Sequence, residues 1–163
     1  MTRRDVLAAA VAVCTGAAVY VSWGKGPPPG PEELIRRQVV EMARAAEARD
    51  VGALMERVST EFSAPDFGDR DALRGLLAAL LLRGEWVRAW PVDVRVALKD
   101  GRSAHANMRM VLGRSTSARL EDLGKDTALS GYRMEMDWRL EGETWRVTSA
   151  TARELSPAEL LTP

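Results

Sequence analysis

Three stretches in the second half of the chain alternate apolar and polar residues with a period of two. The apolar positions are Val92, Val94, Val96 and Leu98; Ala104, Ala106, Met108, Met110 and Leu112; and Tyr132, Met134, Met136, Trp138 and Leu140. A period of two is typical of a β-strand with one buried and one exposed face. The pair Asp100-Gly101 favours a hairpin between the first two strands, and a fourth strand is expected from Thr144 to about Arg153.

Three segments that precede these strands carry apolar residues at helical spacing. The first runs from Pro31 to Arg49, and a proline is well tolerated at the first helical position. Asp50 is a candidate cap for a second helix that ends near Ser59, and Asp69 is one for a third that ends near Arg83. The order of elements predicts an α+β fold, in which three N-terminal helices pack on the apolar face of a curved antiparallel sheet of four long strands.

The first 25 residues have the pattern of a membrane segment. Arg3 and Arg4 are followed by an uncharged stretch from Val6 to Gly24, which as a helix would span about 28 Å, close to the thickness of the bilayer core. Because the basic residues precede the span, the positive-inside rule places the N-terminus in the cytoplasm and the rest of the chain outside. We therefore expect a single membrane-spanning or signal helix, in contact with the membrane through residues 6–24.

This segment has four interpretations. A retained anchor is favoured by its full length and by Tyr20 and Trp23 at its far end. A cleaved export signal is the alternative, since small residues between Thr15 and Ala18 offer cleavage sites. Acylation of Cys14, as in a lipoprotein, fits less well because a large residue precedes the cysteine. A buried core helix also fits less well, because the segment is apolar all round.

The chain is thus divided into four parts. Residues 1–25 are the membrane anchor or export signal, 26–31 a linker of proline and glycine, 32–155 the α+β domain, and 156–163 a C-terminal tail with a capping box at Ser156. Abundant alanine and an excess of arginine over lysine are typical of high-GC bacterial coding. These features predict a single-pass protein of the bacterial cytoplasmic membrane with its domain outside, or a periplasmic protein after cleavage.

Charge and cysteine content exclude several classes of function. The whole chain has 23 basic and 23 acidic side chains; removing Arg3, Arg4 and Lys25 from the first set and Asp5 from the second leaves 20 and 22 for residues 26–163. This balance gives no reason to expect nucleic acid as a partner. The only cysteine is Cys14, so the domain can have neither a disulfide nor a cysteine nucleophile. We expect no metal and no cofactor.

The stretch from Ala45 to Phe62, Ala-Ala-Glu-Ala-Arg-Asp-Val-Gly-Ala-Leu-Met-Glu-Arg-Val-Ser-Thr-Glu-Phe, resembles the opening helical pair of a known family. The segment that begins at Asp69 is similar to the third helix of that family, which the long strands follow. This is the cone-shaped family of nuclear transport factor two and ketosteroid isomerase, also called SnoaL-like. The resemblance, one of pattern and element order, covers about Glu32 to Arg153. It implies the fold but no single activity, because the family contains isomerases, dehydratases and domains without catalysis.

The apolar face of the sheet is the candidate ligand site. Its methionine and aromatic side chains form the predicted pocket: Met108, Met110, Tyr132, Met134, Met136 and Trp138. Methionine adapts to many ligands, and Tyr132 brings the one polar group, although an ordinary core would show the same stripe. A connection of about 19 residues between Gly113 and Gly131 is long for a meander, and its Leu120 and Leu123 are a candidate lid.

The polar face of the sheet carries the histidine and several acids. His105 is in phase with Asn107 and Arg109, so we expect it on the exposed face and not inside the cone. Three acids of the same face are expected to form cross-strand ion pairs with three arginines: Asp93, Glu135 and Asp137 with Arg95, Arg133 and Arg139. We therefore assign no catalytic residue.

These observations predict a membrane-tethered, extracytoplasmic and non-catalytic domain that binds a small apolar ligand or an envelope protein. The alternative is an isomerase- or dehydratase-type enzyme, in which Tyr132 donates a hydrogen bond and Glu61 or Asp66 acts as the base at the mouth of the cone. A third interpretation is a homodimer through the outer face of the sheet. Because that face is charged and buried charges are costly unless paired, only a weak, salt-sensitive dimer is expected.

Overall fold

The computed structural model describes residues 28–83, 88–115, 129–156 and 158–159. The chain divides into two units, Met1–Gly30 and Pro31–Pro163, and the helices and strands named below belong to the second. The predicted membrane segment, residues 6–24, lies outside the described residues. Within the part of the chain that is described, no helix is both long and apolar enough to cross a membrane.

Three helices come first, as predicted: α2 (Pro31–Glu47), α3 (Val51–Glu56) and α4 (Arg70–Arg83). Both predicted caps are confirmed. Asp50 Oδ1 accepts a hydrogen bond from the Ala53 amide at 2.9 Å, and Asp69 Oδ1 accepts one from the Ala72 amide at 2.9 Å. These bonds satisfy amides that the first turn of a helix leaves without partners. Between α3 and α4 lies a small hairpin of β1 (Ser63–Ala64) and β2 (Gly68–Asp69).

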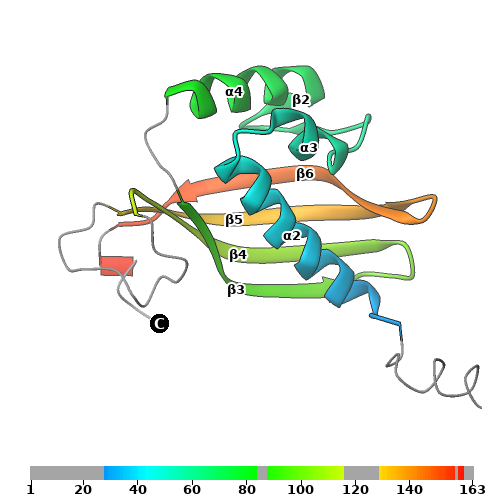
Figure 1. The fold of residues 1–163 in the computed structure, drawn as a ribbon. Helices are drawn as coiled ribbons and strands as arrows, with labels where there is room; N and C mark the ends of the chain where they lie inside the picture. Colours follow the sequence, from blue (N-terminus) through cyan, green and yellow to red (C-terminus); the bar gives the residue numbers. More distant parts are fainter. Residues whose placement is uncertain (1–27, 84–87, 116–128, 157, 160–163) are drawn as a thin grey trace, which may run out of the picture. The chain divides into compact units, whose positions relative to one another are not determined.

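A four-stranded antiparallel sheet follows, in the order β3 (Arg88–Leu98), β4 (Ser103–Gly113), β5 (Leu129–Glu141) and β6 (Thr144–Glu154). Consecutive strands are neighbours, so the sheet is a simple meander (Figure 1). The α+β class is confirmed. The strand β3 begins before the alternation that predicted it and includes Pro91, which an edge strand tolerates.

A bulge in β3 corrects the predicted alternation of that strand. Val92 lies opposite Arg109, and the register then shifts by one residue. Asp93 has a φ of 54°, in the left-handed region, where aspartate is found more often than most residues. Val94 and Val96 therefore pack against the core, whereas Val92 lies on the other face with Arg109.

The core lies between the inner face of the sheet and the helices. Ala104 lies opposite Trp138, and Ala106 lies opposite Met136, so that small side chains on β4 leave room for large ones on β5. All four residues are at most 5% exposed, and Ile35 of α2, which crosses the sheet in Figure 1, packs into the same cluster. This core is built entirely from residues of the second unit, so the unit folds as a domain of its own.

The loop after α3 is hydrogen bonded to the edge of β6. The Ser59 amide donates to the Val147 carbonyl at 2.9 Å, and the Val147 amide donates to the Arg57 carbonyl at 2.9 Å. Val58 and Val147 thus form a parallel bridge, beside a second bulge whose extra residue is Thr148. The pairing covers part of a strand edge whose backbone groups would otherwise be open to other chains.

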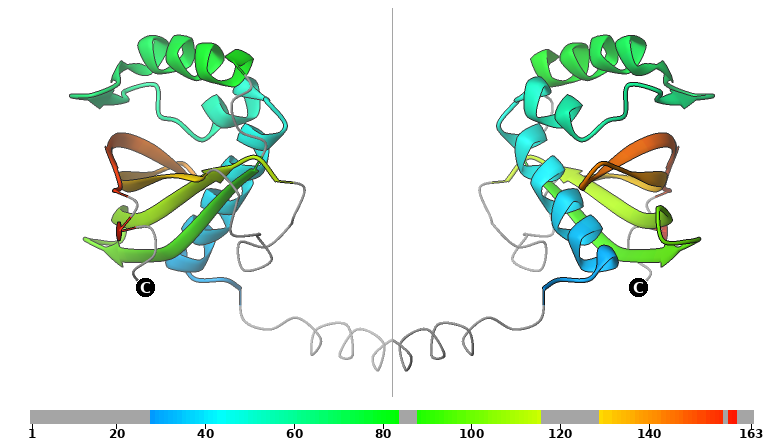
Figure 2. Two further views of the ribbon diagram at one scale, coloured as in Figure 1. Left: turned by 90° about the vertical axis from the view of Figure 1, so that its left-hand side faces the viewer. Right: turned by 90° about the vertical axis from the view of Figure 1, so that its right-hand side faces the viewer.

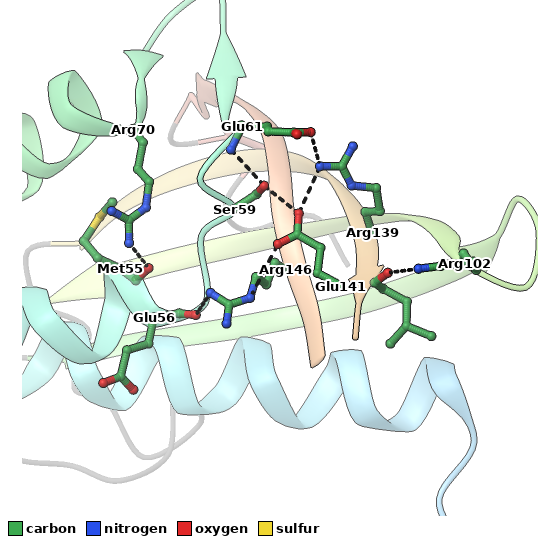
Figure 3. Close-up of polar contacts among 10 residues, drawn as sticks. Met55, Glu56, Ser59, Glu61, Arg70, Arg102, Arg139, Glu141 and Arg146 are labelled. Atoms are coloured by element: carbon green, nitrogen blue, oxygen red, sulfur yellow. Dashed lines mark hydrogen bonds and ion pairs between the residues drawn. The ribbon is translucent and has the colours of Figure 1, made fainter. Parts of the chain in front are cut away.

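Polar side chains reinforce this junction (Figure 3). Ser59 is fully buried; its hydroxyl donates to Glu141 Oε1 at 2.6 Å and accepts from the Glu61 amide at 3.0 Å. Arg139 pairs with both Glu61 and Glu141. The hydrogen bond from Ser59 lowers the pKa of Glu141, and Arg139 lowers it further. The junction is therefore a connected network of charged hydrogen bonds.

A second anchor joins α2 to the opposite edge strand. The carboxylate of Glu47, the last residue of α2, accepts hydrogen bonds from the Ala89 amide and from Arg88 Nη1, both at 2.9 Å. The Glu47 side chain is only 18% exposed, so these bonds are partly shielded from water. The helices are thus attached to both edges of the sheet, at β3 and at β6.

A smaller apolar cluster lies on the outer face of the sheet. Trp90 lies opposite Val111, and the Leu155 amide donates to the Gly131 carbonyl at 2.8 Å. The side chains of Trp90, Val111 and Leu155 are each at most 8% exposed. The predicted capping box follows, and it is confirmed by reciprocal hydrogen bonds. The Ser156 amide donates to Glu159 Oε2 at 3.0 Å, and the Glu159 amide donates to Ser156 Oγ at 3.4 Å.

We expect the replacement Glu141→Gln to lower the free energy of unfolding of the fragment 28–163 by about 1–3 kcal/mol at pH 7, because Ser59 and Arg139 lose a charged acceptor. The folded pKa of Glu141 lies below its ordinary value of 4.5, so this stabilisation is complete above that value and is lost as the pH falls through the folded pKa. Urea unfolding from pH 7 to acid measures the difference between the two proteins.

The matched control is Glu143→Gln, in the same turn, where the glutamate is exposed. Its stability is expected to stay within about 0.5 kcal/mol of the original at every pH. Equal losses for the two variants, or a difference that does not shrink in acid, would contradict the assigned role of Glu141.

Candidate functional site

A cavity of about 750 Å³ lies between the sheet and the helices. This volume falls within the range of small-molecule sites, about 300–1,000 Å³. Among its described lining residues, the only polar side chains are those of Arg114, Ser130 and Tyr132. The remaining walls are made of alanine, valine, leucine, methionine and phenylalanine side chains with one glycine. The cavity therefore suits a ligand that is mostly apolar.

The roof of the cavity is α4, which stands apart from the sheet in the side views of Figure 2. It lies beside β2 and α3, and Arg70, its first residue, donates a hydrogen bond to the Met55 carbonyl of α3 at 3.0 Å. Five leucines of this helix line the cavity: Leu73, Leu76, Leu77, Leu80 and Leu81. Leu76 and Leu80 are 39% and 41% exposed, because the space beneath the helix is open. Leu73 packs into the core cluster with residues of the sheet and Leu77 packs against that cluster, so α4 lies over the apolar face of the sheet as expected, with the cavity beneath part of it.

The floor of the cavity contains four of the six residues that the sequence predicts as a ligand pocket. Met110, Tyr132, Met134 and Met136 line it. The other two, Met108 and Trp138, are 2% and 1% exposed and pack in the core outside the cavity. All six lie on the same face of the sheet, so alternation alone could not separate core from cavity. The candidate lid residues, Leu120 and Leu123, lie outside the described residues.

Polarity changes along the floor of the cavity from one end to the other. On β5 the inner-face side chains are, in order, Ser130, Tyr132, Met134 and Met136. Ser130 and Arg114 are exposed, which marks this end as the mouth, whereas Val58 and Val147 at the other end are buried. Within the described part of the chain, the Tyr132 hydroxyl has no hydrogen-bond partner. The polar groups of the site are therefore gathered at its mouth.

The acids predicted for a catalytic role do not line the cavity. Glu61 pairs with Arg139 in the junction with β6, and Asp66 is exposed in the β1–β2 turn. The acid that sequence reasoning missed is Glu154, which lies directly opposite Tyr132 on β6. It is exposed and does not line the cavity either. Only the strand register, which includes the β6 bulge, could have identified this neighbour.

The single histidine lies on the outer face of the sheet, as predicted. His105 is directly opposite Asp137, and its Nδ1 lies 3.0 Å from Asp137 Oδ1. Partial burial raises the pKa of Asp137, but hydrogen bonds from Lys99 and His105 outweigh this and leave it below its ordinary value. The pair is separated from the cavity by the thickness of the sheet.

Two of the predicted ion pairs of the outer face, those of Asp93 and Asp137, are corrected, and that of Glu135 stays a prediction. Asp93 pairs with Arg109, Asp137 with Lys99, and Arg139 with two glutamates. The partners differ because the β3 bulge displaces Asp93 and because Lys99 reaches across from the first hairpin. Nine residues outline a shallow polar groove here: Asp93, Arg95, Asn107, Met108, Arg109, Arg133, Glu135, Ala158 and Glu159. A weak homodimer through this face stays a prediction.

Comparison with solved structures identifies the fold. A nuclear transport factor 2-like protein with a cystatin-like fold from Novosphingobium aromaticivorans is 20% identical, with a TM-score of 0.57 over 80% of this chain and 88% of that one. A protein provisionally named as a scytalone dehydratase from the same species is 12% identical, with a TM-score of 0.60 over 76% and 83%. A provisionally named dehydratase of the nuclear transport factor 2-like family from Streptomyces avermitilis is 14% identical, with a TM-score of 0.58 over 76% and 95%.

At these identities the comparisons show the fold alone. The resemblance inferred from the order of elements is confirmed at that level. No family model matches the chain, and no curated protein matches it significantly. Two of the similar structures carry the provisional name of a dehydratase, but a shared fold does not by itself assign an activity.

We expect the substitutions Met108→Ala and Met134→Ala to separate the core from the cavity. The first should cost about 2–5 kcal/mol of unfolding free energy, as is usual for a methionine in a filled core. The second should cost clearly less, because Met134 already borders open space and loses fewer contacts. Urea unfolding of both variants of the fragment 28–163 provides the comparison. A larger loss for Met134→Ala would show that the cavity is not open as described.

Proposed function

Starting from a chain with the cone-shaped fold of nuclear transport factor 2-like proteins, we propose that this protein is a non-catalytic domain that binds a small apolar molecule inside its cone. The single observation that carries the proposal is the cavity of about 750 Å³ with almost entirely apolar walls. Each Å² of apolar ligand surface that is buried contributes roughly 25 cal/mol to the free energy of binding, so such walls favour an apolar molecule.

The state of the roof supports this proposal. Leu76 and Leu80 of α4 face the cavity and yet remain about two-fifths exposed. Large apolar side chains that stay exposed in a cluster usually mark a binding surface. A ligand beneath α4 would cover both leucines and would fill the gap between this helix and the sheet. An envelope protein in place of a small molecule is the alternative occupant.

The absence of acids from the described walls favours binding over catalysis. A general base has to lie within about 3 Å of the proton that it removes, either directly or through one water. Neither Glu61 nor Asp66 lines the cavity, and His105 is on the opposite face.

A second candidate function is an isomerase- or dehydratase-type reaction. It is favoured by the register that places Glu154 directly opposite Tyr132, which would bring a base and a hydrogen-bond donor to the mouth. Glu154 is exposed and would have to turn into the cavity to act on a bound molecule. Two structures with a similar fold carry the provisional name of a dehydratase, which supports this second candidate.

We also propose that residues 1–25 keep the domain at the outer surface of the cytoplasmic membrane. The support is the sequence itself, with two arginines before an uncharged stretch and two aromatic residues at its far end. A retained anchor and the short proline-rich linker would hold the cavity close to the lipid surface.

Ligand binding is tested by thermal unfolding of the fragment 28–163 in the presence of the neutral apolar dye N-phenyl-1-naphthylamine. Dye at 100 times its dissociation constant should stabilise the domain by about 2.7 kcal/mol and raise its melting temperature by several degrees. The same titration should increase dye fluorescence to saturation at one site. An unchanged melting temperature together with non-saturating fluorescence would remove the proposal.

A matched pair of variants locates the binding site. Ala152 lines the cavity opposite Met134, whereas its neighbour Thr151 lies opposite Glu135 on the outer face. We expect Ala152→Phe to fill the cavity and weaken dye binding at least about tenfold while stability is kept or raised, because the new ring occupies empty space. Thr151→Phe should bind dye as the original does. Equal effects of the two variants would place the dye elsewhere.

The membrane proposal is tested by the mass of the mature N-terminus. When the full chain is expressed in bacteria, we expect the membrane fraction to hold a protein that retains residues 1–25. A protein that begins after residue 18 and is found in the periplasmic fraction would instead indicate a cleaved signal.

A further inference from the structure

We infer that the ligand of the cavity is an amphiphile, with an aliphatic chain inside the cone and an anionic head group held at the mouth by Arg114, Ser130 and Tyr132. This inference rests on the proposed binding function and adds the chemical class of the ligand. It follows from how polarity is distributed along the walls, and not from the size of the cavity.

The deep walls suit an aliphatic chain better than a flat ring. They are made chiefly of leucine and methionine, including Met42, Met110, Met134 and Met136 from three different elements. Unbranched thioether side chains change shape at little cost, so they can follow a flexible chain. Among the described lining residues, only Phe62 and Phe67 bring apolar rings, and both belong to the segment between α3 and α4. Of the described residues on the sheet floor, Tyr132 alone offers an aromatic ring.

The mouth suits an anion. Arg114 is the only charged side chain among the described lining residues, and it follows directly on the last residue of β4. Ser130 lies opposite Leu112, the residue of β4 that precedes Gly113, so the guanidinium and the hydroxyl come from adjacent strands at the same end of the sheet. Tyr132 adds a second hydroxyl one inner-face position deeper. An arginine and two hydroxyl donors are a set that binds a carboxylate or a phosphate by charged hydrogen bonds.

Among the described residues, a carboxylate near the mouth opposes the binding of an anion. Glu154 lies opposite Tyr132 at the same end of the sheet, although it does not line the cavity. Removing this carboxylate should therefore strengthen the binding of an anionic head group, whereas removing the guanidinium should weaken it. Two variants with opposite expected effects follow from the same geometry.

The experiment compares dodecanoate with dodecanol as competitors of N-phenyl-1-naphthylamine on the fragment 28–163 at pH 8. Their chains are alike, so any difference in displacement belongs to the head group. We expect dodecanoate to displace the dye at a concentration about tenfold lower than dodecanol does. The monoacyl lipid 1-dodecanoyl-lysophosphatidate provides a second arm: if it displaces the dye at a lower concentration than dodecanoate, a membrane lipid is the source, and the reverse order indicates a free fatty acid.

Variants assign the preference to the mouth. Arg114→Gln should remove the preference for dodecanoate and leave dodecanol unchanged, Arg114→Lys should retain most of it, and Glu154→Gln should increase it. The matched control is Arg133→Gln, since Arg133 is exposed on the outer face of β5. Melting of each variant without ligand is recorded first. A preference that survives Arg114→Gln, or that is equally lost in Arg133→Gln, overturns the inference.

The failure of this inference and that of the proposed function are distinguishable. If dodecanol and dodecanoate displace the dye from the original protein at the same concentration, the cavity binds apolar chains but does not distinguish their head groups. In that case only the present inference is wrong. If neither competitor nor dye binds, the proposed function itself is wrong.

Discussion

The hydrogen bonds between residues 57–59 and Val147 determine where the helical layer stands. They attach the segment after α3 to the edge of β6. The hydrogen bond from the Ser59 hydroxyl to the Glu141 carboxylate reinforces this attachment. At the other edge, Glu47 binds the start of β3. Because the helices are attached at both edges of the sheet, they span its middle. The cavity is the space between the helices and the sheet.

The cavity and its polarity follow from this arrangement. Because α4 is supported near its first turn by β2 and α3, its leucines roof the space without filling it. The side chains of all four strands supply the floor, and small residues such as Ala150 and Ala152 keep it open. The strand ends lie at the mouth, where backbone and polar side chains meet water. The cavity is therefore apolar inside and polar at its mouth, because the inner-face residues of β5 change from Ser130 and Tyr132 at the mouth to Met134 and Met136 inside.

The two faces of the sheet have separate roles because side chains alternate along each strand. The inner face holds the core and the cavity, while the outer face holds His105, Asp137 and the arginines of β4 and β5. This separation explains why carboxylates are numerous in the chain and yet, like the histidine, missing from the described walls of the cavity.

The sequence by itself determined the class of the fold, both helix caps, the capping box and the face on which each residue of β4 and β5 lies, because these depend on local spacing and on hydrogen bonds within a few residues. It also placed Tyr132 and the methionines of β4 and β5 on the apolar face of the sheet. Only the tertiary structure decided that Met108 and Trp138 belong to the core, that Val92 leaves the apolar face, and that Glu154 is the neighbour of Tyr132. Bulges shift the register between strands, and the height of a helix above a sheet depends on contacts far apart in the chain; neither quantity is encoded in the period of any single segment.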